Sequence, residues 1–198
     1  MKILLYGGTF DPPHKGHLHL LKTAINFLNP DKVVVMPAGI PPHKNASSTP
    51  ATLRLAMCEY FMGLGKKVSI SDWEIAQKGK SYTIDTISYL KQCYPNGKVY
   101  LLIGSDMLTS FTTWRNWEQI MQECIIIALC RETQETEQFA QAADCLKKHG
   151  EIILLQADVL PESSTNIRNQ LLNRKKAEDV LPTEVAKIVK QYNLYVDF

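Results

Sequence analysis

His14 and His17 form a pair of imidazoles shortly after a glycine pair, Gly7 and Gly8. The glycines end an apolar run over residues 2–6, which predicts a buried strand that delivers its carboxyl end to a turn. Ligands bind at such turns in open α/β sheets, and glycine lets main-chain N–H groups approach a phosphate with no side chain between them. This turn is therefore the first candidate site.

A helix is predicted to begin near Gly16, because apolar residues recur at three- and four-residue spacings from Leu18 to Leu28. Its first turn would carry both imidazoles beside its free N–H groups and the positive end of its dipole, which together suit an anion. A metal site would also use two histidines, but no third and fourth ligand follows at a recognised spacing. We interpret the pair as phosphate-binding, and His19 and His149 as surface residues.

Further polar residues follow two later apolar runs that are also predicted to be strands. Lys44 lies in a proline-rich loop after the run over residues 32–36, and such a loop is by itself typical of a surface connection. Gly104 and Asp106 follow the run over residues 99–103. A carboxylate at that place either accepts hydrogen bonds from ribose hydroxyls or caps a helix.

A late polar cluster, Ser164, Thr165 and Arg168, follows the run over residues 152–155 and begins another apolar-periodic helix. Serine and threonine at such a place are good helix caps. They also offer hydroxyls, open N–H groups and, with the arginine one turn in, a fixed positive charge to an anion.

Aromatic residues and a helix start complete the candidates. Trp114 and Trp117 lie on either side of Arg115, and the two rings are either core residues or a surface on which a flat heterocycle could stack. Ser81 or Thr83 is predicted to cap a helix that runs to about residue 93, leaving open N–H groups at its start.

Arg54 lies in the second turn of a helix that Thr49 and Pro50 are predicted to open, as cap and first-turn proline. A solvated side chain is the commoner state of such an arginine, although its length would also let it reach the loop before the helix.

Composition places the chain among compact proteins of ordinary charge. With 198 residues, 45% of them hydrophobic, it can bury a sizeable core as one domain. Its net charge of +2 gives no steering field for nucleic acid. The five cysteines are scattered without a C-x-x-C pair, which argues against a disulfide framework and a zinc site. Since no apolar run approaches the length of a membrane span, we expect a soluble, cytoplasmic protein with no membrane partner.

Predicted strands alternate with helices along the whole chain. The strands are expected at residues 2–6, 32–36, 67–71, 99–103, 124–129 and 152–155. This alternation predicts an α/β fold, a Rossmann-like open and mostly parallel sheet with helices on both faces. All the polar motifs would then lie at one edge of the sheet, at the crevice where the strand order reverses.

The motifs over residues 7–17 and 163–168 together resemble the nucleotidyltransferase superfamily of the HxGH type. Within it, the stretches 41–44, 81–86 and 103–106 are similar to those of bacterial nicotinate mononucleotide adenylyltransferases, and the resemblance runs to about residue 195. It implies one nucleotidyltransferase domain over residues 1–198, in which a C-terminal helical part, about 161–198, closes the nucleotide site.

The resemblance also implies a reaction. AMP would move from ATP to nicotinate mononucleotide, giving deamido-NAD and pyrophosphate, with Mg²⁺ bound through the ATP phosphates and no metal ligands from the protein. The implied catalytic residues are His14, His17, Lys44 and Arg168. The implied ATP-binding residues are Gly7, Gly8, Thr9, Phe10, His14, His17, Gly104, Asp106, Ser164, Thr165, Ile167 and Arg168. The implied nicotinate nucleotide-binding residues are Gly8, Thr9, Lys44, Tyr82, Thr83, Trp114 and Arg115.

One residue departs from the family pattern. The family often carries an aromatic residue directly after the tryptophan, where this chain has Arg115, so stacking would be thinner or the arginine would pair with the nicotinate carboxylate. We expect the acid to be preferred over the amide.

Other functions remain open at this stage. The chain could be an adenylyl- or cytidylyltransferase for another phosphorylated acceptor, such as phosphopantetheine, or a non-catalytic nucleotide-binding regulator. A class I aminoacyl-tRNA synthetase would need a much longer chain. We expect no nucleic-acid partner and consider a homo-oligomer possible.

Overall fold

The computed structural model describes residues 1–41, 49–130, 136–156, 162–173 and 179–196. The described residues form one six-stranded sheet in the order β3-β2-β1-β4-β5-β6, and all neighbouring strands are parallel. The strands are β1 (Lys2–Gly8), β2 (Lys32–Pro37), β3 (Val68–Ile70), β4 (Lys98–Gly104), β5 (Ile125–Cys130) and β6 (Ile152–Gln156). The predicted Rossmann-like fold is confirmed.

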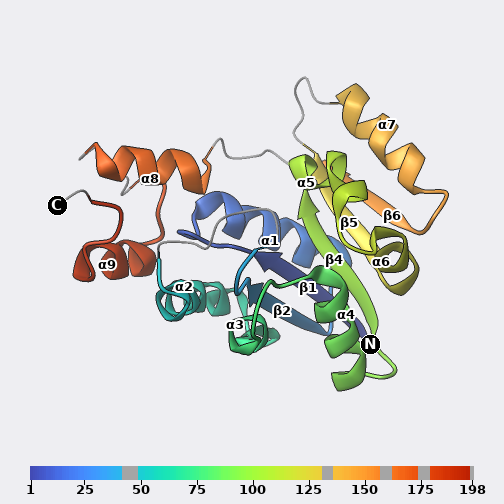
Figure 1. Cartoon of the computed structure of the whole chain (residues 1–198), viewed down its shortest axis with the longest axis horizontal. Coiled ribbons are helices and arrows are strands. Elements are labelled where there is room, and N and C mark those ends of the chain that lie inside the picture. Colours follow the sequence, from blue (N-terminus) through green and yellow to red (C-terminus); the bar gives the residue numbers. More distant parts are fainter. Residues whose placement is uncertain (42–48, 131–135, 157–161, 174–178, 197–198) are drawn as a thin grey trace.

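Helices connect the strands (Figure 1). The helices are α1 (Lys15–Leu28), α2 (Ala51–Cys58), η1 (Glu59–Leu64), α3 (Trp73–Ala76), α4 (Thr83–Cys93), α5 (Ser105–Thr109), η2 (Phe111–Thr113), α6 (Trp117–Glu123), α7 (Thr136–Leu146), α8 (Ser164–Leu172) and α9 (Thr183–Gln191). None of those within the described part of the chain is long and apolar enough to cross a membrane.

Both faces of the sheet are buried, which is why its strands are continuous apolar runs rather than alternating ones. Along β1, Ile3 and Leu5 belong to a core shared with α4, α5, α6 and α7. Leu4 and Tyr6 face the opposite way, into a core shared with α1 and η1. The helices thus form a layer on each side of the sheet, as the alternation of strands and helices predicts.

The strand order reverses between β1 and β4. From β1 the chain proceeds outward through β2 and β3, and it returns to β4 on the other side of β1 before continuing to β5 and β6. The loops that follow β1 and β4 therefore leave the sheet in opposite directions, and a crevice opens between them at the carboxyl edge.

Helices α8 and α9 lie together beside α1 and α2 (Figure 1). They share a third apolar cluster with α2, made of Met57, Ile167, Leu181, Val185 and Val189. At α2 the predicted cap is wrong in detail: Pro50 is the N-cap itself, and no side chain caps this helix. Thr49 is instead buried.

Candidate functional site

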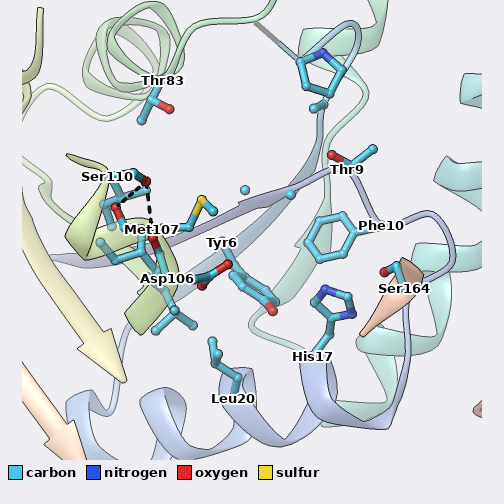
Figure 2. Close-up of a pocket in the computed structure, with 18 of the residues that line it drawn as sticks. Tyr6, Thr9, Phe10, His17, Leu20, Thr83, Asp106, Met107, Ser110 and Ser164 are labelled. Atoms are coloured by element: carbon cyan, nitrogen blue, oxygen red, sulfur yellow. Dashed lines mark hydrogen bonds between the residues drawn. The ribbon is translucent and has the colours of Figure 1, made fainter. Parts of the chain in front are cut away.

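A cavity of about 1210 Å³ occupies the crevice between β1 and β4, and we call it the pocket. Its walls come from the β1–α1 turn and from the first residues of α4, α5 and α8 (Figure 2). The predicted site residues that line it are Gly7, Gly8, Thr9, Phe10, His14, His17, Tyr82, Thr83, Gly104, Asp106, Trp114, Arg115, Ser164, Thr165 and Arg168. Segments far apart in the sequence thus share one cavity.

Two predicted site residues are not among them. Ile167 is buried in the C-terminal cluster, and its N–H already donates to the Ser163 carbonyl at 3.0 Å. Lys44 lies outside the described residues.

An aromatic group lies beneath the β1–α1 turn. The ring of Phe10 is 2% exposed and meets the rings of Tyr6 and His17 edge to face, at centroid distances of 5.3 and 5.2 Å. A Cβ added to Gly8 would lie only 2.9 Å from the Phe10 ring. Glycine is therefore required here so that the ring can lie against the main chain at the end of β1.

His14 and His17 lie against each other, with ring centroids 3.7 Å apart. The His14 main-chain N–H donates to His17 Nδ1 at 3.2 Å. An accepting Nδ1 means that the neutral His17 ring carries its proton on Nε2, so this nitrogen is the donor that the ring can offer. Figure 2 shows the ring below Phe10, on the same side of the pocket as Ser164.

His14 is held neutral by its surroundings. Burial lowers the pKa of His14 to about 4, and its Nδ1 has no hydrogen-bond partner among the described residues. A Cβ on Gly16 would lie 3.0 Å from two atoms of this ring, so a glycine at this position leaves room for the imidazole. The main chain of His14 is also held by Tyr60, whose hydroxyl donates to the His14 carbonyl at 3.1 Å.

The start of α8 meets the β1–α1 turn directly. Ser164 Oγ donates to the Pro12 carbonyl at 2.9 Å, and Arg168 Nη1 donates to the Asp11 carbonyl at 2.7 Å. These partners are 152 and 157 positions apart in the chain. Ser163 is the cap of the helix and accepts from the Asn166 N–H. The motif over residues 7–17 and the motif over residues 163–168 therefore lie in contact, as the sequence predicted.

The β4–α5 turn supplies a carboxylate to the pocket. Gly104 is the N-cap of α5, and a Cβ there would lie 2.8 Å from Asp106 Oδ1. The Asp106 carboxylate lies near the Tyr6 side chain (Figure 2). Burial raises the pKa of Tyr6, and the nearby Cys58 and Asp106 side chains add to that effect. Tyr6 is thus a neutral phenol in the pocket wall.

The start of α4 has open N–H groups. Neither predicted capping residue caps the helix: Tyr82 is the N-cap and makes no side-chain capping bond. Ser81 Oγ accepts from the Gly39 N–H at 3.0 Å instead. The guanidinium of Arg115 lies over the Tyr82 ring, 4.6 Å from its centroid, which is cation–π distance. A cation and a helix N-terminus therefore stand at one wall of the pocket.

The two tryptophans both pack against the core and differ in their other surroundings. Trp114 lines the pocket and contacts Phe111 at a centroid distance of 5.0 Å. Trp117 packs against the core and meets the exposed His149 ring edge to face at 4.7 Å. His149 is a surface residue as predicted, whereas His19 is half-buried.

Arg54 is not the solvated side chain that is commoner at such a place, and it reaches the loop before its helix, which is the other state that the sequence left open. It is 1% exposed, and its guanidinium donates to the carbonyls of Thr9 at 2.8 Å and of Gly39 at 3.1 Å. A signal was present in the sequence: Arg54 shares the helical stripe of Met57, Cys58 and Phe61, all of which are buried.

Glu74 was not predicted at all. It is buried in the wall of the pocket and accepts from Thr86 Oγ1 at 2.5 Å. Burial raises the pKa of Glu74, and the hydrogen bonds from Thr86 and Ser81 oppose that rise. No periodicity marks this residue, because it faces the pocket from a helix of only four residues, α3.

The pocket offers groups that can bind an anion. Its donors are imidazole, guanidinium, hydroxyl and main-chain N–H groups, and its lining also includes the acidic residues Asp11, Glu74, Asp106 and Glu162. Among the residues that the structure describes, no group of three or more histidine, cysteine or acidic side chains is placed to hold a metal ion. The arrangement can therefore bind and orient phosphates at the two histidines and the start of α8.

The sequence matches the profile of the cytidylyltransferase-like family over residues 5–170. It is 35% identical over 197 residues to a protein of Clostridium tetani named probable nicotinate-nucleotide adenylyltransferase, covering 98% of both chains. A protein of the same name from Neisseria meningitidis serogroup C is 34% identical over 198 residues, again covering 98% of both chains.

A similar fold is found in the nicotinic acid mononucleotide adenylyltransferase of Plasmodium falciparum, solved in complex with NaAD. The TM-score is 0.79 at 21% sequence identity, covering 98% of this chain and 97% of that one.

Proposed function

This chain belongs to the cytidylyltransferase-like family and, within it, to the nicotinate-nucleotide adenylyltransferases, and on that premise we propose how its pocket carries out the reaction. The enzyme transfers AMP from ATP to nicotinate mononucleotide, a step of NAD biosynthesis. We assign roles to the residues chiefly from one observation, the contact between the β1–α1 turn and α8 through Ser164 and Arg168.

The 5′-phosphate of nicotinate mononucleotide attacks the α-phosphorus of ATP in line. A new P–O bond forms, the bond from the α-phosphorus to the bridging oxygen breaks, and pyrophosphate leaves with the electron pair. The nucleophile is already an anion, so it needs no general base, and the protein has to align the phosphates and stabilise charge.

His17 is the donor best suited to the developing charge. Its Nδ1 accepts from the His14 N–H, which leaves Nε2–H as the donor that we assign to the phosphate. His14 binds beside it as a neutral ring, because burial keeps it unprotonated near pH 7. A pair of charged imidazoles at 3.7 Å would repel each other, and the neutral pair avoids that repulsion.

The other predicted roles follow the walls of the pocket. Ser164, Thr165 and Arg168 hold the departing pyrophosphate at the start of α8. Gly7, Gly8, Thr9 and Phe10 form the main-chain floor, Gly104 and Asp106 bind ribose hydroxyls, and Ile167 contributes through the position of its helix. Lys44 would add a charge to the pyrophosphate from the loop after β2.

The nicotinate ring is assigned to the wall formed by Tyr82, Thr83, Trp114 and Arg115. Trp114 offers a flat ring, while the open N–H groups of α4 and the Arg115 cation offer donors to a carboxylate. An amide would need an acceptor as well as donors there, so preference for the acid follows.

Mg²⁺ fits this donor set as an ion held by the ATP phosphates rather than by the protein. The described residues hold the phosphates through N–H, hydroxyl and guanidinium groups and contain no carboxylate cage. When bound, the ion neutralises charge on the triphosphate. The chain's own residues supply the orientation. Three further expectations remain predictions. They are a single domain closed over the nucleotide by residues 161–198, a cytoplasmic location, and the lack of a nucleic-acid partner.

Pyrophosphate release tests the proposal. We expect release when ATP is combined with nicotinate mononucleotide, and little with nicotinamide mononucleotide or phosphopantetheine. Release with phosphopantetheine alone would reassign the acceptor. No release with any acceptor would identify a nucleotide-binding regulator instead.

A further inference from the structure

Tyr195, close to the C-terminal end, is joined to the β1–α1 turn by a short hydrogen bond. Its hydroxyl donates to Asp11 Oδ1 at 2.6 Å, across 184 positions of the chain. Asp11 is only 7% exposed, and the buried Thr49 side chain also hydrogen-bonds with Tyr195. The phenol is therefore oriented by partners from two separate segments.

The same turn is also held by Arg54. The buried guanidinium donates to the carbonyls of Thr9 and Gly39, and so ties the β1–α1 turn to the loop after β2. Burial lowers the pKa of Arg54, and the nearby Asp11 carboxylate opposes that shift. Asp11 thus accepts from a phenol of the C-terminal segment and lies near a cation from α2.

The backbone on both sides of this contact is strained. Phe10, directly before Asp11, has φ of 51°, and Tyr195 has φ of 62°. Bulky side chains rarely adopt this left-handed region, and they remain in it only where surrounding contacts hold them. Such strain is concentrated at functional sites, which favours a role for the contact beyond simple packing.

We propose that Tyr195 is a positioning residue, which acts through Asp11 to hold the turn of Phe10 and His14 in the arrangement that the reaction requires. The proposal rests on the proposed function for the identity of the reaction. Under this proposal, the residues that determine the reaction rate include a C-terminal residue that touches neither substrate. Since donors aimed at a developing charge act mainly in the transition state, a displaced turn would lower kcat more than substrate binding.

The test is Tyr195→Phe, which removes one hydroxyl and leaves the ring. We expect kcat with ATP and nicotinate mononucleotide to fall about 10-fold, since small misplacements of reacting groups reduce rates by up to about 100-fold. KM for either substrate should stay within about twofold of wild type. The matched control is Tyr192→Phe, the same change on the same segment at a side chain that is 51% exposed, and its kcat should equal that of wild type.

A double variant, Tyr195→Phe with Asp11→Asn, tests the route of the effect. If Tyr195 acts through Asp11, the fold-loss of kcat in the double variant should be smaller than the product of the fold-losses in the two single variants. Equal kcat for Tyr195→Phe and Tyr192→Phe, or a double loss equal to that product, would overturn the proposal.

The wild-type acceptor assay keeps this test separate from the proposed function. If wild type turns over a different phosphorylated acceptor, the proposed function fails, and the same comparison of variants is made with that acceptor. Lack of turnover with every acceptor would overturn both.

Discussion

At the scale of single residues, a hydrogen bond decides which nitrogen of His17 is the donor in the proposed mechanism. The bond from the His14 N–H occupies Nδ1, so Nε2 carries the proton of the neutral ring. The spacing of the two histidines makes this bond possible, because His14 is the N-cap of α1 and the side chain of the third helical residue, His17, can reach back to the N-cap N–H.

His17→Ala is therefore expected to lower kcat by about 10²- to 10³-fold, the scale for loss of one preorganised donor, with little change in KM for ATP. Steady-state pyrophosphate release measures both constants. The exposed His149→Ala serves as control and should retain wild-type kcat. Full turnover by the His17 variant would remove this imidazole from the mechanism.

The burial of His14 predicts a dependence of stability on pH. The pKa of His14 falls from 6.5 to about 4 on folding. Below pH 6.5 the unfolded chain takes up a proton that the folded chain does not, so the free energy of unfolding decreases as pH falls toward 4. This residue alone would remove roughly 3 kcal/mol over that window.

Urea unfolding of wild type and His14→Gln at pH 7 and pH 4.5 measures that contribution. The variant lacks the titrating group, so its free energy of unfolding should decrease less between the two pH values. An equal decrease in both proteins would show that His14 is not the group responsible.

At the scale of elements, helix α4 and the turn that carries Arg115 together make the wall of the pocket to which we assign the nicotinate ring. The helix contributes open N–H groups at Thr83, and the turn contributes a cation stacked on Tyr82. The N-cap makes no capping bond, so those N–H groups are available to a carboxylate.

Arg115→Gln is expected to lower kcat/KM for nicotinate mononucleotide about 10-fold and to leave that for nicotinamide mononucleotide within about twofold, because only the acid loses a charged partner. Competing both acceptors for one enzyme sample gives the ratio directly. Lys148→Gln, which removes one exposed positive charge outside the pocket, controls for net charge. If the ratio of the two kcat/KM values is unchanged in Arg115→Gln, the preference for the acid over the amide would come from α4 alone.

At the scale of the whole molecule, the reversal of strand order is what brings the motifs together. The β1 and β4 loops diverge at the carboxyl edge, and α8 reaches the same place from the end of the chain (Figure 1). A polyphosphate bound there would contact elements that are distant in sequence but fixed by one sheet and one C-terminal cluster.

Binding of a non-hydrolysable ATP analogue should therefore slow amide hydrogen exchange at two sites together, residues 7–17 and residues 163–168. Saturating ligand at about 100 times its Kd adds about 2.7 kcal/mol to the stability of the bound state. Exchange measured by mass spectrometry with and without the analogue tests this. Slower exchange at only one of the two segments would contradict a shared polyphosphate site.

The sequence alone determined the elements and the kinds of chemistry, because both depend on local pattern. Apolar runs, helical periodicity and glycine before a histidine pair are short-range signals, and they predicted the strands, the sheet edge and the polar residues at the starts of α1, α5 and α8. Only the tertiary structure decided the partners of Arg54, Glu74 and Tyr195. These contacts join segments 15, 12 and 184 positions apart, and no periodicity in a chain specifies which distant group a buried polar side chain will meet.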